Sequence, residues 1–553
     1  MLRHELIQAI TDAILKAQDE GALPAFEVPS IPLEHPRRRF SGDYASPVCM
    51  QLARVAHMGP MEIAEGVVQH LPSLECLGQA EVARPGFINF TLDHGWLAQQ
   101  VGEILRAGET FGNVDLGQGR RMQVEYISGN PTGPLHIGHG RNAVIGDAIA
   151  NVLEAAGYDV QREYYINDAG SRMLAFYETL YARYAQELGC DEAVPEEGYA
   201  GFYMVELARE ILATEGSRFL DMPREQAVSE LGRIGLERVL ASIRSDAAML
   251  GIHYDRWFSE QSLYDDGTFD KAMALLREKG YVEEREGAVW FRATLLGGSK
   301  DEVIIRSDGT PGYFASDIAY HYDKFLTRGF EWVIDVWGAD HQGHVPRMKA
   351  LMRALDLDPE QLTIILYQLV TLKRGGEVIR LSKRTGEMIT LQEVLSDVGA
   401  DAVHFFLLSR AADSQMDFDL ELAREQSDEN PVYYVQYAHA RIASILSYAG
   451  DTNYSEANLS SLREEPEMAL IRKLLEFPEV VEMAASTLAP HHLGYYAQDL
   501  AGIFHSFYKQ CRVVSSEPEH AERNKARLAL VSAAKIVLHR VLTMMGMNAP
   551  EKM

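Results

Sequence analysis

The sequence predicts an α/β protein, and three features of the chain carry that prediction. Strand-like apolar runs alternate with helical stretches between residues 123 and 372, and they include 303–305, where the sheet pattern resumes, and 362–372. The near-continuous apolar run 332–337 is typical of a strand buried on both faces of a parallel sheet. From Val432 onward, nearly all apolar residues recur at helical spacing. Together these features predict a doubly wound, Rossmann-type parallel sheet and an all-α C-terminal bundle.

The chain has 553 residues, which is too long for one hydrophobic core. We expect a small α/β domain over residues 1–112 and a doubly wound α/β domain over 113–428. Its helical insertion is expected at about 171–300, where amphipathic helices separate two parts of the sheet pattern. A helix is expected over 391–412, and the α-helical domain is expected over 429–553.

Composition narrows the class of protein. The net charge of −28 by itself argues against a nucleic-acid partner. The charge is uneven, however, with ten acidic and three basic residues over 191–230 but two acidic and six basic over 521–553. A local basic RNA-binding face on an acidic body therefore remains possible, and so do two ordinary solvated faces.

Targeting and redox features favour a cytoplasmic protein. No run of eighteen apolar residues indicates a membrane span, and the N-terminus does not have the pattern of a signal peptide. The four cysteines are far apart and form no C-x-x-C pair, which supports neither a zinc site nor a disulfide framework.

The stretch 123–142 organises the chain. Residues 123–127 alternate polar and apolar side chains, which predicts a strand. Residues 128–134, ending at Pro134, hold two glycines and two prolines and must form an irregular loop. A helical pattern begins at Ile137. A strand, a turn and a helix in this order present backbone N–H groups and a positive dipole end to an anion.

Two histidines lie at the start of this helix. His136 and His139 are three residues apart, hence on one face, and Gly138 leaves the backbone open to a bulky ligand. His-Ile-Gly-His resembles the nucleotide-binding motif of class I aminoacyl-tRNA synthetases, whose histidines contact the phosphates of ATP. The alternative is two surface histidines in an ordinary helix start.

A second motif lies downstream. Residues 380–384, Arg-Leu-Ser-Lys-Arg, resemble the Lys-Met-Ser-Lys-Ser motif of the same class, with Arg380 in place of the first lysine and Ser382 and Lys383 retained. A mobile cation over the departing pyrophosphate suits the chemistry, although a basic Gly-flanked loop alone is more often a solvated turn. With both motifs present, we expect an adenylating site that uses ATP and its accompanying Mg²⁺, without protein-bound zinc.

Four residues suggest which amino acid is activated. A guanidinium prefers planar carboxylate partners. The arginine-binding positions of arginyl-tRNA synthetases are matched residue by residue by two pairs in this chain. These pairs are Glu125 and Asn130, five residues apart, and Tyr313 and Asp317, four residues apart. Considered singly, Asp317 is better explained as a helix cap and Tyr313 as a core aromatic; as a set, the match to the arginine-binding positions is favoured.

The last element of this pocket is left open. In the family an amide or imidazole near the later polar turn completes the guanidinium site, and either His341 or the adjacent Gln342 fits that role here.

The N-terminal region carries a further resemblance. We predict helices over 1–22 and 61–70 and a strand pair broken at 84–86. Gly-Asp-Tyr-Ala-Ser at 42–46 and Gly-Phe-Ile-Asn-Phe at 86–90 resemble the N-terminal domain of arginyl-tRNA synthetases, which meets the tRNA elbow. The resemblance implies that Phe87 and Asn89 read a base; otherwise Phe87 is core and Asn89 caps a turn.

The C-terminal region resembles the helical anticodon-binding domain of the same family, including the closing residues 549–553. Aromatic and basic helix faces suit the reading of splayed bases. Tyr437 and Arg441 are the leading candidates, although ordinary packing explains them about as well. Further candidates are His439, Tyr508, Lys509 and Arg512.

The sequence therefore predicts an arginine–tRNA ligase that forms arginyl-adenylate from L-arginine and ATP and passes arginine to the terminal adenosine of tRNA(Arg). The resemblance implies that activation requires bound tRNA. We expect a cytoplasmic monomer without a membrane partner. A lysine-specific enzyme and an inactive tRNA-binding paralogue are the alternatives; a cysteine-specific enzyme is disfavoured because no zinc-ligand cluster is present.

Overall fold

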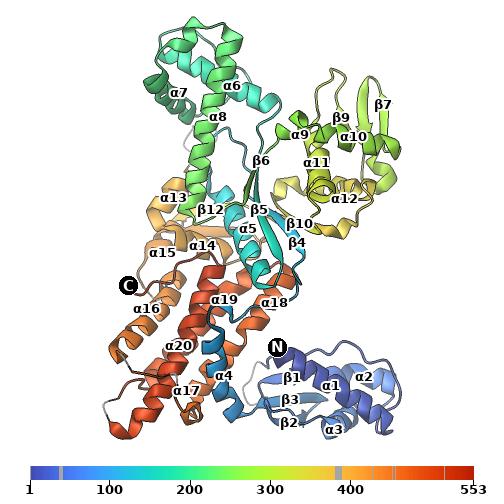
Figure 1. Ribbon diagram of the computed structural model, residues 1–553, viewed down its shortest axis with the longest axis vertical. Helices are drawn as coiled ribbons and strands as arrows, with labels where there is room; N and C mark the ends of the chain where they lie inside the picture. The colour runs from blue at the N-terminus through green and yellow to red at the C-terminus, as the bar shows by residue number, and fades with distance from the viewer. Residues whose placement is uncertain are drawn as a thin grey trace.

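The computed structural model describes residues 2–36, 42–379, 389–427, 429–450, 452–454, 456–515 and 517–553. Figure 1 shows a central sheet with a helical bundle below it, a small N-terminal domain beside the bundle, and two lobes above the sheet. None of the helices in these ranges combines the length and the apolar content that crossing a bilayer requires.

The N-terminal domain packs helices against an antiparallel sheet of order β1-β3-β2. The two predicted helices and the predicted strand pair form as α1, α3, β2 and β3, whereas α2 and β1 were not predicted. The next helix, α4 (His94–Ala107), packs against α17 and α20 of the C-terminal bundle (Figure 1). The other elements are α1 (Leu2–Asp19), β1 (Tyr44–Ser46), α2 (Val48–Ala56), α3 (Pro60–His70), β2 (Leu77–Ala83) and β3 (Phe87–Leu92).

The central sheet is doubly wound, as predicted. In the described residues it has five strands in the order β11-β10-β4-β5-β6, and all neighbours are parallel. The chain enters at β4 and later adds β5 on one side and β10 on the other, so the strand order reverses at β4. The strands are β4 (Arg121–Glu125), β5 (Asp159–Ile166), β6 (Arg256–Ser259), β10 (Trp332–Gly338) and β11 (Leu362–Tyr367).

Helix α5 (Ile137–Ala155) connects the sheet to the bundle. It packs on β4, β5 and β10 and also on α14 and α18. Nearly all of its residues are buried, including Arg141 and Asn142. The Arg141 guanidinium donates to the carbonyls of Gln368 and Ala411 at 2.7 and 2.9 Å. A helix buried on all sides is held in one place, and so is its N-terminus.

The predicted insertion over about 171–300 is interrupted. Residues 256–259 return to the central sheet as β6, so there are two insertions. The first is a helical lobe of α6 (Ser171–Glu187), α7 (Phe202–Glu215) and α8 (Arg224–Met249). The second contains α9 (Ser262–Asp265), α10 (Thr268–Glu278), β7 (Val282–Arg285), β8 (Ala288–Phe291), β9 (Glu302–Ile305) and α11 (Tyr313–Tyr322), and it has its own hydrophobic core together with α12 (Val345–Ala354).

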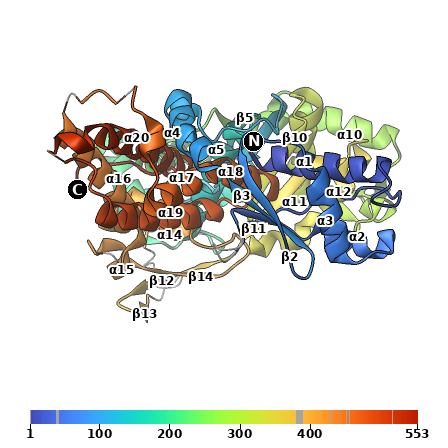
Figure 2. The ribbon, with the colours of Figure 1, turned by 90° about the horizontal axis from the view of Figure 1, so that it is seen from below.

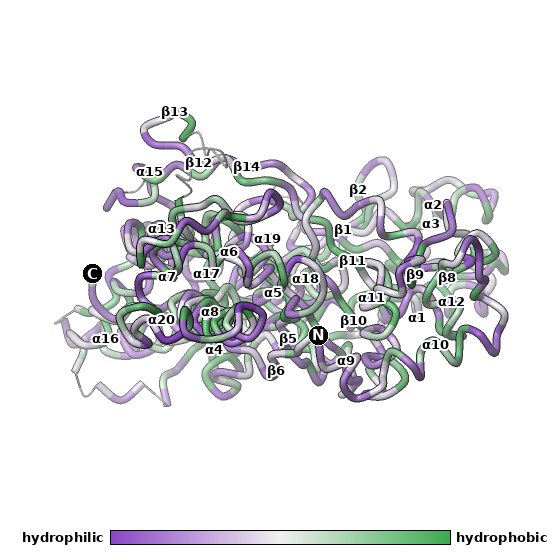
Figure 3. Tube along the Cα trace, turned by 90° about the horizontal axis from the view of Figure 1, so that it is seen from above, coloured by the Kyte–Doolittle hydropathy of each residue, from purple (hydrophilic) through white to green (hydrophobic). Residues whose placement is uncertain are grey.

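Two strand predictions are wrong in detail. The run 303–305 does not resume the central sheet, because β9 pairs with β8 in a separate antiparallel sheet. The run 362–372 is two strands, β11 and β12 (Val370–Arg374), and β12 pairs with β13 (Glu377–Val378) and β14 (Met416–Asp419). Figures 2 and 3 show this second sheet at one edge of the molecule.

The C-terminal region is helical, as predicted. The helix expected over 391–412 divides at Gly399, whose φ of 80° suits a glycine and separates α13 (Leu391–Val398) from α14 (Ala400–Leu408). The remaining helices are α15 (Leu420–Arg424), α16 (Pro431–Ala449), α17 (Glu465–Leu475), α18 (Phe477–Thr487), α19 (His491–Gln510) and α20 (Ala521–Met544).

Polar contacts join the N-terminal domain to the bundle. The Asp43 carboxylate lies 2.6 Å from Nε of Arg472 on α17. The Tyr44 hydroxyl donates to Glu479 on α18 at 2.5 Å, and His35 Nε2 lies 3.2 Å from the same carboxylate. Two residues of the Gly-Asp-Tyr-Ala-Ser motif therefore lie in the interface between domains. Burial disfavours the His35 imidazolium, but Glu479 outweighs this effect and raises the pKa of His35.

This interface predicts a pH dependence. The pKa of His35 is raised when the N-terminal domain contacts the bundle. The stabilisation of this interface by His35 is therefore complete at pH values below the ordinary histidine pKa, roughly 6.5. It is lost as pH rises through the raised pKa. Hydrogen exchange of the α18 amides, corrected for intrinsic rates, is expected to speed up from pH 6 to pH 8. His35→Gln is expected to abolish this dependence. An unchanged dependence in that variant would assign it to another group.

Candidate active site

The two histidines of the first motif form one stacked pair. His136 is the N-cap residue of α5, and its Nδ1 accepts from the N–H of Gly138 at 3.0 Å. Nδ1 of His139 accepts from the N–H of His136 at 3.2 Å. The ring centroids are 3.9 Å apart. Since both Nδ1 atoms accept, the neutral rings carry their protons on Nε2, which makes each Nε2–H a donor.

His139 is held in the neutral form. Burial, and then the neighbouring His136, lower the pKa of His139 to about 3. Gly138 is required here for a reason that the sequence did not reveal, because a methyl group at this position would lie 2.9 Å from Cε1 of His136. The glycine makes room for the histidine ring.

The loop after β4 is strained and firmly held. The strand ends at Glu125, two residues before the predicted end, because Ile127 and Ser128 have φ angles of 63° and 42°. A positive φ is costly for a β-branched residue. The buried Asn142 amide compensates by accepting from the N–H of Ile127 at 2.6 Å and donating to the carbonyl of Val336 at 2.8 Å. Asn130 follows in this loop and is exposed.

The segment after the second motif lies against the first. Thr390 forms an isolated antiparallel bridge with His136, and the N–H of Leu391 donates to the carbonyl of Leu135 at 2.8 Å. The predicted ATP contacts Arg380, Ser382 and Lys383 lie outside the described residues. Thr390 and Leu391, which follow the segment of the second motif, therefore lie next to the histidine pair. Pro134, which precedes this pair in the chain, is half-buried.

Two predicted arginine contacts are carboxylates that already have cationic neighbours. Glu125 is buried at the end of β4, 2.6 Å from Nζ of Lys324. Asp317 is the fifth residue of α11. It is half-buried, and its carboxylate lies 3.6 Å from a guanidinium nitrogen of Arg347. Burial raises the pKa of Asp317, and Arg347 opposes this effect.

The simpler alternatives for α11 are wrong. Gly312 is the N-cap residue of this helix, so Asp317 does not cap it. Tyr313 is 68% exposed and does not belong to the core. The guanidinium groups of Arg172 and Arg306 lie 5.4 and 5.9 Å from its ring centroid.

The third element of the pocket remains undecided between two residues. His341 and Gln342 are both exposed on the 3₁₀ segment η6 (Ala339–His344), which directly follows β10. The His341 ring lies 6.0 Å from Trp337 and 5.2 Å from His344 between centroids. Both residues stay candidates.

The N-terminal base-reading candidates share an outward face. Along β3, Phe87, Asn89 and Thr91 are half-buried, whereas Ile88, Phe90 and Leu92 are buried. Asn89 pairs with Ala45 and Glu81 in the middle of the sheet, so it does not cap a turn. Phe87 likewise lies outside the core.

The bundle candidates divide into two groups. Tyr437 stacks on Tyr433 at 5.9 Å, and the Arg441 guanidinium lies 5.3 and 5.4 Å from the rings of Tyr437 and Tyr508. These side chains are at least partly exposed. His439 is fully buried, with Nδ1 2.8 Å from the carbonyl of Pro550, which favours packing for that residue. Lys509 and Arg512 are exposed.

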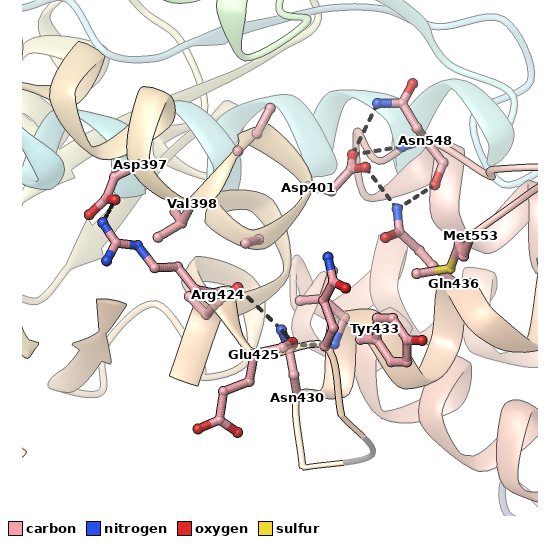
Figure 4. Close-up of a pocket in the computed structure, with 16 residues that line it drawn as sticks. Asp397, Val398, Asp401, Arg424, Glu425, Asn430, Tyr433, Gln436, Asn548 and Met553 are labelled. Atoms are coloured by element: carbon pink, nitrogen blue, oxygen red, sulfur yellow. Dashed lines mark hydrogen bonds and ion pairs between the residues drawn. The ribbon is translucent and has the colours of Figure 1, made fainter. Parts of the chain in front are cut away.

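A separate pocket lies between α13, α14, α15, α16 and the C-terminal segment (Figure 4). Asp401 accepts there from the N–H of Asn548 at 2.9 Å and from the amide of Gln436 at 2.7 Å. Of the described residues that line it, none is a predicted site residue. The hydrogen bonds of Asp401 connect the C-terminal segment to the helices of the bundle.

The sequence analysis missed the cation beneath Glu125. Lys324 is fully buried and its Nζ also lies 2.8 Å from Asp335 on β10. The available signal was Asp335 itself, a lone carboxylate in the apolar strand 332–337, because a buried charge requires a partner.

Comparisons with known proteins agree with this geometry. Three family models match in order: the arginyl-tRNA synthetase N-terminal domain over 4–92, the class I tRNA synthetase (R) catalytic domain over 100–413, and the DALR anticodon-binding domain over 435–553. The catalytic model covers more than half of the chain. The protein is thus a class I aminoacyl-tRNA synthetase, an enzyme class that uses ATP.

Full-length relatives define the specificity. The chain is 53% identical to the arginine–tRNA ligase of Dehalococcoides mccartyi strain CBDB1, over 100% of this chain and 99% of that one. It is 48% identical to the arginine–tRNA ligase of Heliobacterium modesticaldum, with the same coverage. The structure of Thermus thermophilus arginyl-tRNA synthetase superimposes with a TM-score of 0.78 at 25% identity, covering 100% of both chains. The chain belongs to the arginyl-tRNA synthetase family, the arginine–tRNA ligases of class I.

The protonation of the histidine pair is testable. We expect both imidazoles to be Nε2–H tautomers at neutral pH, and His139 to stay neutral down to about pH 4, since its pKa is about 3. Long-range ¹⁵N–¹H spectra of histidine-labelled protein, assigned with His136→Asn and His139→Asn, measure this. A His139 that titrates near pH 6.5, its ordinary value, would contradict the prediction.

Proposed function

We propose that the site formed by β4, β10, α5 and α11 activates arginine, with ATP on the histidine pair and arginine among the carboxylates. The observation that carries this proposal is the common location of the two groups. Glu125 ends β4, and α5, with His136 at its cap, starts after the loop that follows this strand. Arginine would therefore lie beside the triphosphate.

ATP is proposed to bind across the N-terminus of α5. The Nε2–H groups of His136 and His139 donate to phosphate oxygens, with Gly138 and Pro134 beneath the nucleotide. Arg380, Ser382 and Lys383 supply the second set of contacts. Mg²⁺ accompanying ATP would offset negative charge on the phosphates; zinc has no part in the proposal, because the four cysteines are far apart in the sequence.

In the proposed first step, a carboxylate oxygen of arginine attacks the α-phosphorus of ATP. The bond from the α-phosphorus to the bridging oxygen breaks, and pyrophosphate leaves with that electron pair. Neutral imidazoles that donate hydrogen bonds stabilise the charge on the phosphate oxygens without a proton transfer. A hydroxyl of the terminal adenosine of tRNA then attacks the carbonyl carbon of the adenylate. The bond from this carbon to the phosphate oxygen breaks, AMP leaves with the electron pair, and the hydroxyl proton passes to AMP or to solvent.

Recognition of arginine is proposed to divide between two elements. Glu125 and Asn130 hold the backbone groups and part of the side chain, whereas Tyr313 and Asp317 on α11 hold the guanidinium. His341 or Gln342 completes the pocket. A carboxylate that accepts from a planar guanidinium balances its charge and satisfies its N–H donors.

Substitution of Asp317 tests this division. Asp317→Asn is expected to raise KM for arginine roughly ten- to a hundredfold, as for the loss of one charge-assisted hydrogen bond, with KM for ATP unchanged. Asp265→Asn, an exposed carboxylate on α9, is the matched control. Pyrophosphate exchange with arginine or lysine, with tRNA present, measures both specificity and affinity; exchange with lysine alone would refute the arginine pocket.

Activity itself depends on the second motif in this proposal. Lys383→Ala is expected to reduce kcat for arginylation by roughly a hundredfold or more, the size of effect seen when one transition-state contact is removed. Unchanged charging would exclude Lys383 from the mechanism, and charging activity in the wild type excludes the inactive paralogue.

The tRNA is proposed to contact both ends of the molecule. Phe87 and Asn89 stack on and hydrogen-bond an unstacked base of the elbow, and Tyr437 and Arg441 contact the anticodon arm. We further propose that the protein works in the cytoplasm as a monomer. Analytical ultracentrifugation of the free enzyme and of its tRNA complex tests the oligomeric state.

The face of β3 offers an internal control for tRNA binding. Phe87→Ala is expected to raise KM for tRNA roughly five- to a hundredfold, the usual cost of losing a base–aromatic stack. Thr91→Ala, which removes a half-buried side chain from the same face, is expected to leave KM for tRNA near the wild-type value. Equal effects of both substitutions would indicate damage to the sheet.

A further inference from the structure

Three buried carboxylates lie side by side across the central sheet. Glu125 on β4 is in register with Asp335 on β10 and with Glu163 on β5. Their exposed fractions are 6%, 0% and 0%. Residues in register on neighbouring strands have side chains on the same face, at close spacing. We call this set the carboxylate row.

Arg256 on β6 lies 4.0 Å from Glu163, but one short segment contacts all three carboxylates of the row. It is residues 320–328, the end of α11 and the π-helical turn η5 (Asp323–Thr327). The Tyr320 hydroxyl donates to Glu163 at 2.6 Å, and Arg328 pairs with the same carboxylate. His321 Nε2 lies 3.0 Å from Asp335.

Lys324 is the cation of this segment that reaches Glu125. Its ammonium group donates to Glu125 at 2.6 Å and to Asp335 at 2.8 Å, and lies 4.0 Å from the ring centroid of Tyr320. Lys324 lies in the π-helical turn, a feature that changes the register of side chains along a helix and is frequent at functional sites.

The protonation states follow from these contacts. Burial favours neutral Lys324, but the two carboxylates outweigh this effect and raise its pKa. Burial also opposes ionised Asp335, whose pKa Lys324 and His321 nevertheless hold below its ordinary value. Burial raises the pKa of Glu125 even with Lys324 beside it. Without the ammonium, two adjacent buried carboxylates would not both stay ionised.

We infer that Lys324 is a positioning residue for arginine binding, whose ammonium keeps the Glu125 carboxylate charged and oriented toward the substrate. This inference rests on the proposed contact between Glu125 and arginine. Lys324 is on the same chain segment as Tyr313 and Asp317, eleven and seven residues before it, so it also joins the α11 side of the pocket to the β4 side.

A double-mutant cycle tests the inference. The variants are E125Q, K324M and E125Q/K324M, compared through KM for arginine and KM for ATP in tRNA arginylation. K324M is expected to raise KM for arginine roughly ten- to a hundredfold and to leave KM for ATP unchanged. In the E125Q background the same substitution is expected to add nothing, because Lys324 acts through Glu125.

Arg328 provides the matched control. It comes from the same segment and pairs with a buried carboxylate of the same row, but with Glu163 and not with Glu125. R328M is expected to lower thermal stability while KM for arginine stays at the wild-type value. In K324M, but not in R328M, kcat/KM for arginine is expected to fall as pH is lowered, because Glu125 without its cation takes up a proton more readily.

The outcomes separate the inference from the function on which it rests. If E125Q leaves KM for arginine unchanged, the proposed contact of Glu125 fails. If E125Q raises it and K324M does not, Lys324 has no positioning role although the proposed function stands. If K324M alone does not fold, K324Q takes its place with the same expectation: a raised KM for arginine with an unchanged KM for ATP supports the inference, and a wild-type KM for arginine overturns it.

Discussion

The fixed position of helix α5 is the constraint on which the rest of the structure depends. The helix is enclosed between the parallel sheet and the helical bundle, and its buried Arg141 and Asn142 bond to backbone carbonyls of other elements. Such bonds are costly to break, because each would leave a buried polar group unsatisfied. The N-terminus of α5 therefore holds the histidine pair in one orientation.

The electrostatics beside this helix have an unusual balance. A site for a cationic substrate needs carboxylates, and a parallel sheet that aligns its strands in register brings three of them together. Cations from residues 320–328 pair with these carboxylates, Arg256 on β6 lies 4.0 Å from Glu163, and one of the cations is a fully buried lysine. Buried ion pairs are seldom favourable for stability alone. Their cost is understandable where a fixed negative charge is needed at the site.

Two residues of the Gly-Asp-Tyr-Ala-Ser motif at 42–46 lie in the interface between the N-terminal domain and the bundle. Asp43 and Tyr44 contact α17 and α18 of the bundle. The helix that follows the N-terminal sheet, α4, packs on the bundle as well. Contacts of this kind set the distance between the outward face of β3 and the aromatic residues of α16. A tRNA that meets both ends would meet two surfaces already placed relative to each other.

Local sequence decided the elements whose signals are local. The strand–turn–helix around residues 121–155, the apolar strand 332–338 and the helical bundle follow from short-range periodicity and from glycine and proline positions. The residue types at 136, 139, 125, 313 and 317 were likewise sufficient to indicate the chemistry. The strand pairings were not: nothing local distinguishes β6 or β9 from other short apolar runs, and the division of residues 362–372 depends on which partner each half finds.

The tertiary structure alone decided the ionic arrangement of the site. The chain separates Glu125 from Lys324 by about two hundred residues, and only the parallel register of β4 with β10 and the π-helical turn after α11 bring them together. It also decided that Tyr313 is exposed and His439 buried, since burial depends on which elements pack against a residue. The sequence by itself determined the class of chemistry, because that resides in residue types at short spacing. The partners of each charge were decided by long-range packing, which short spacing does not encode.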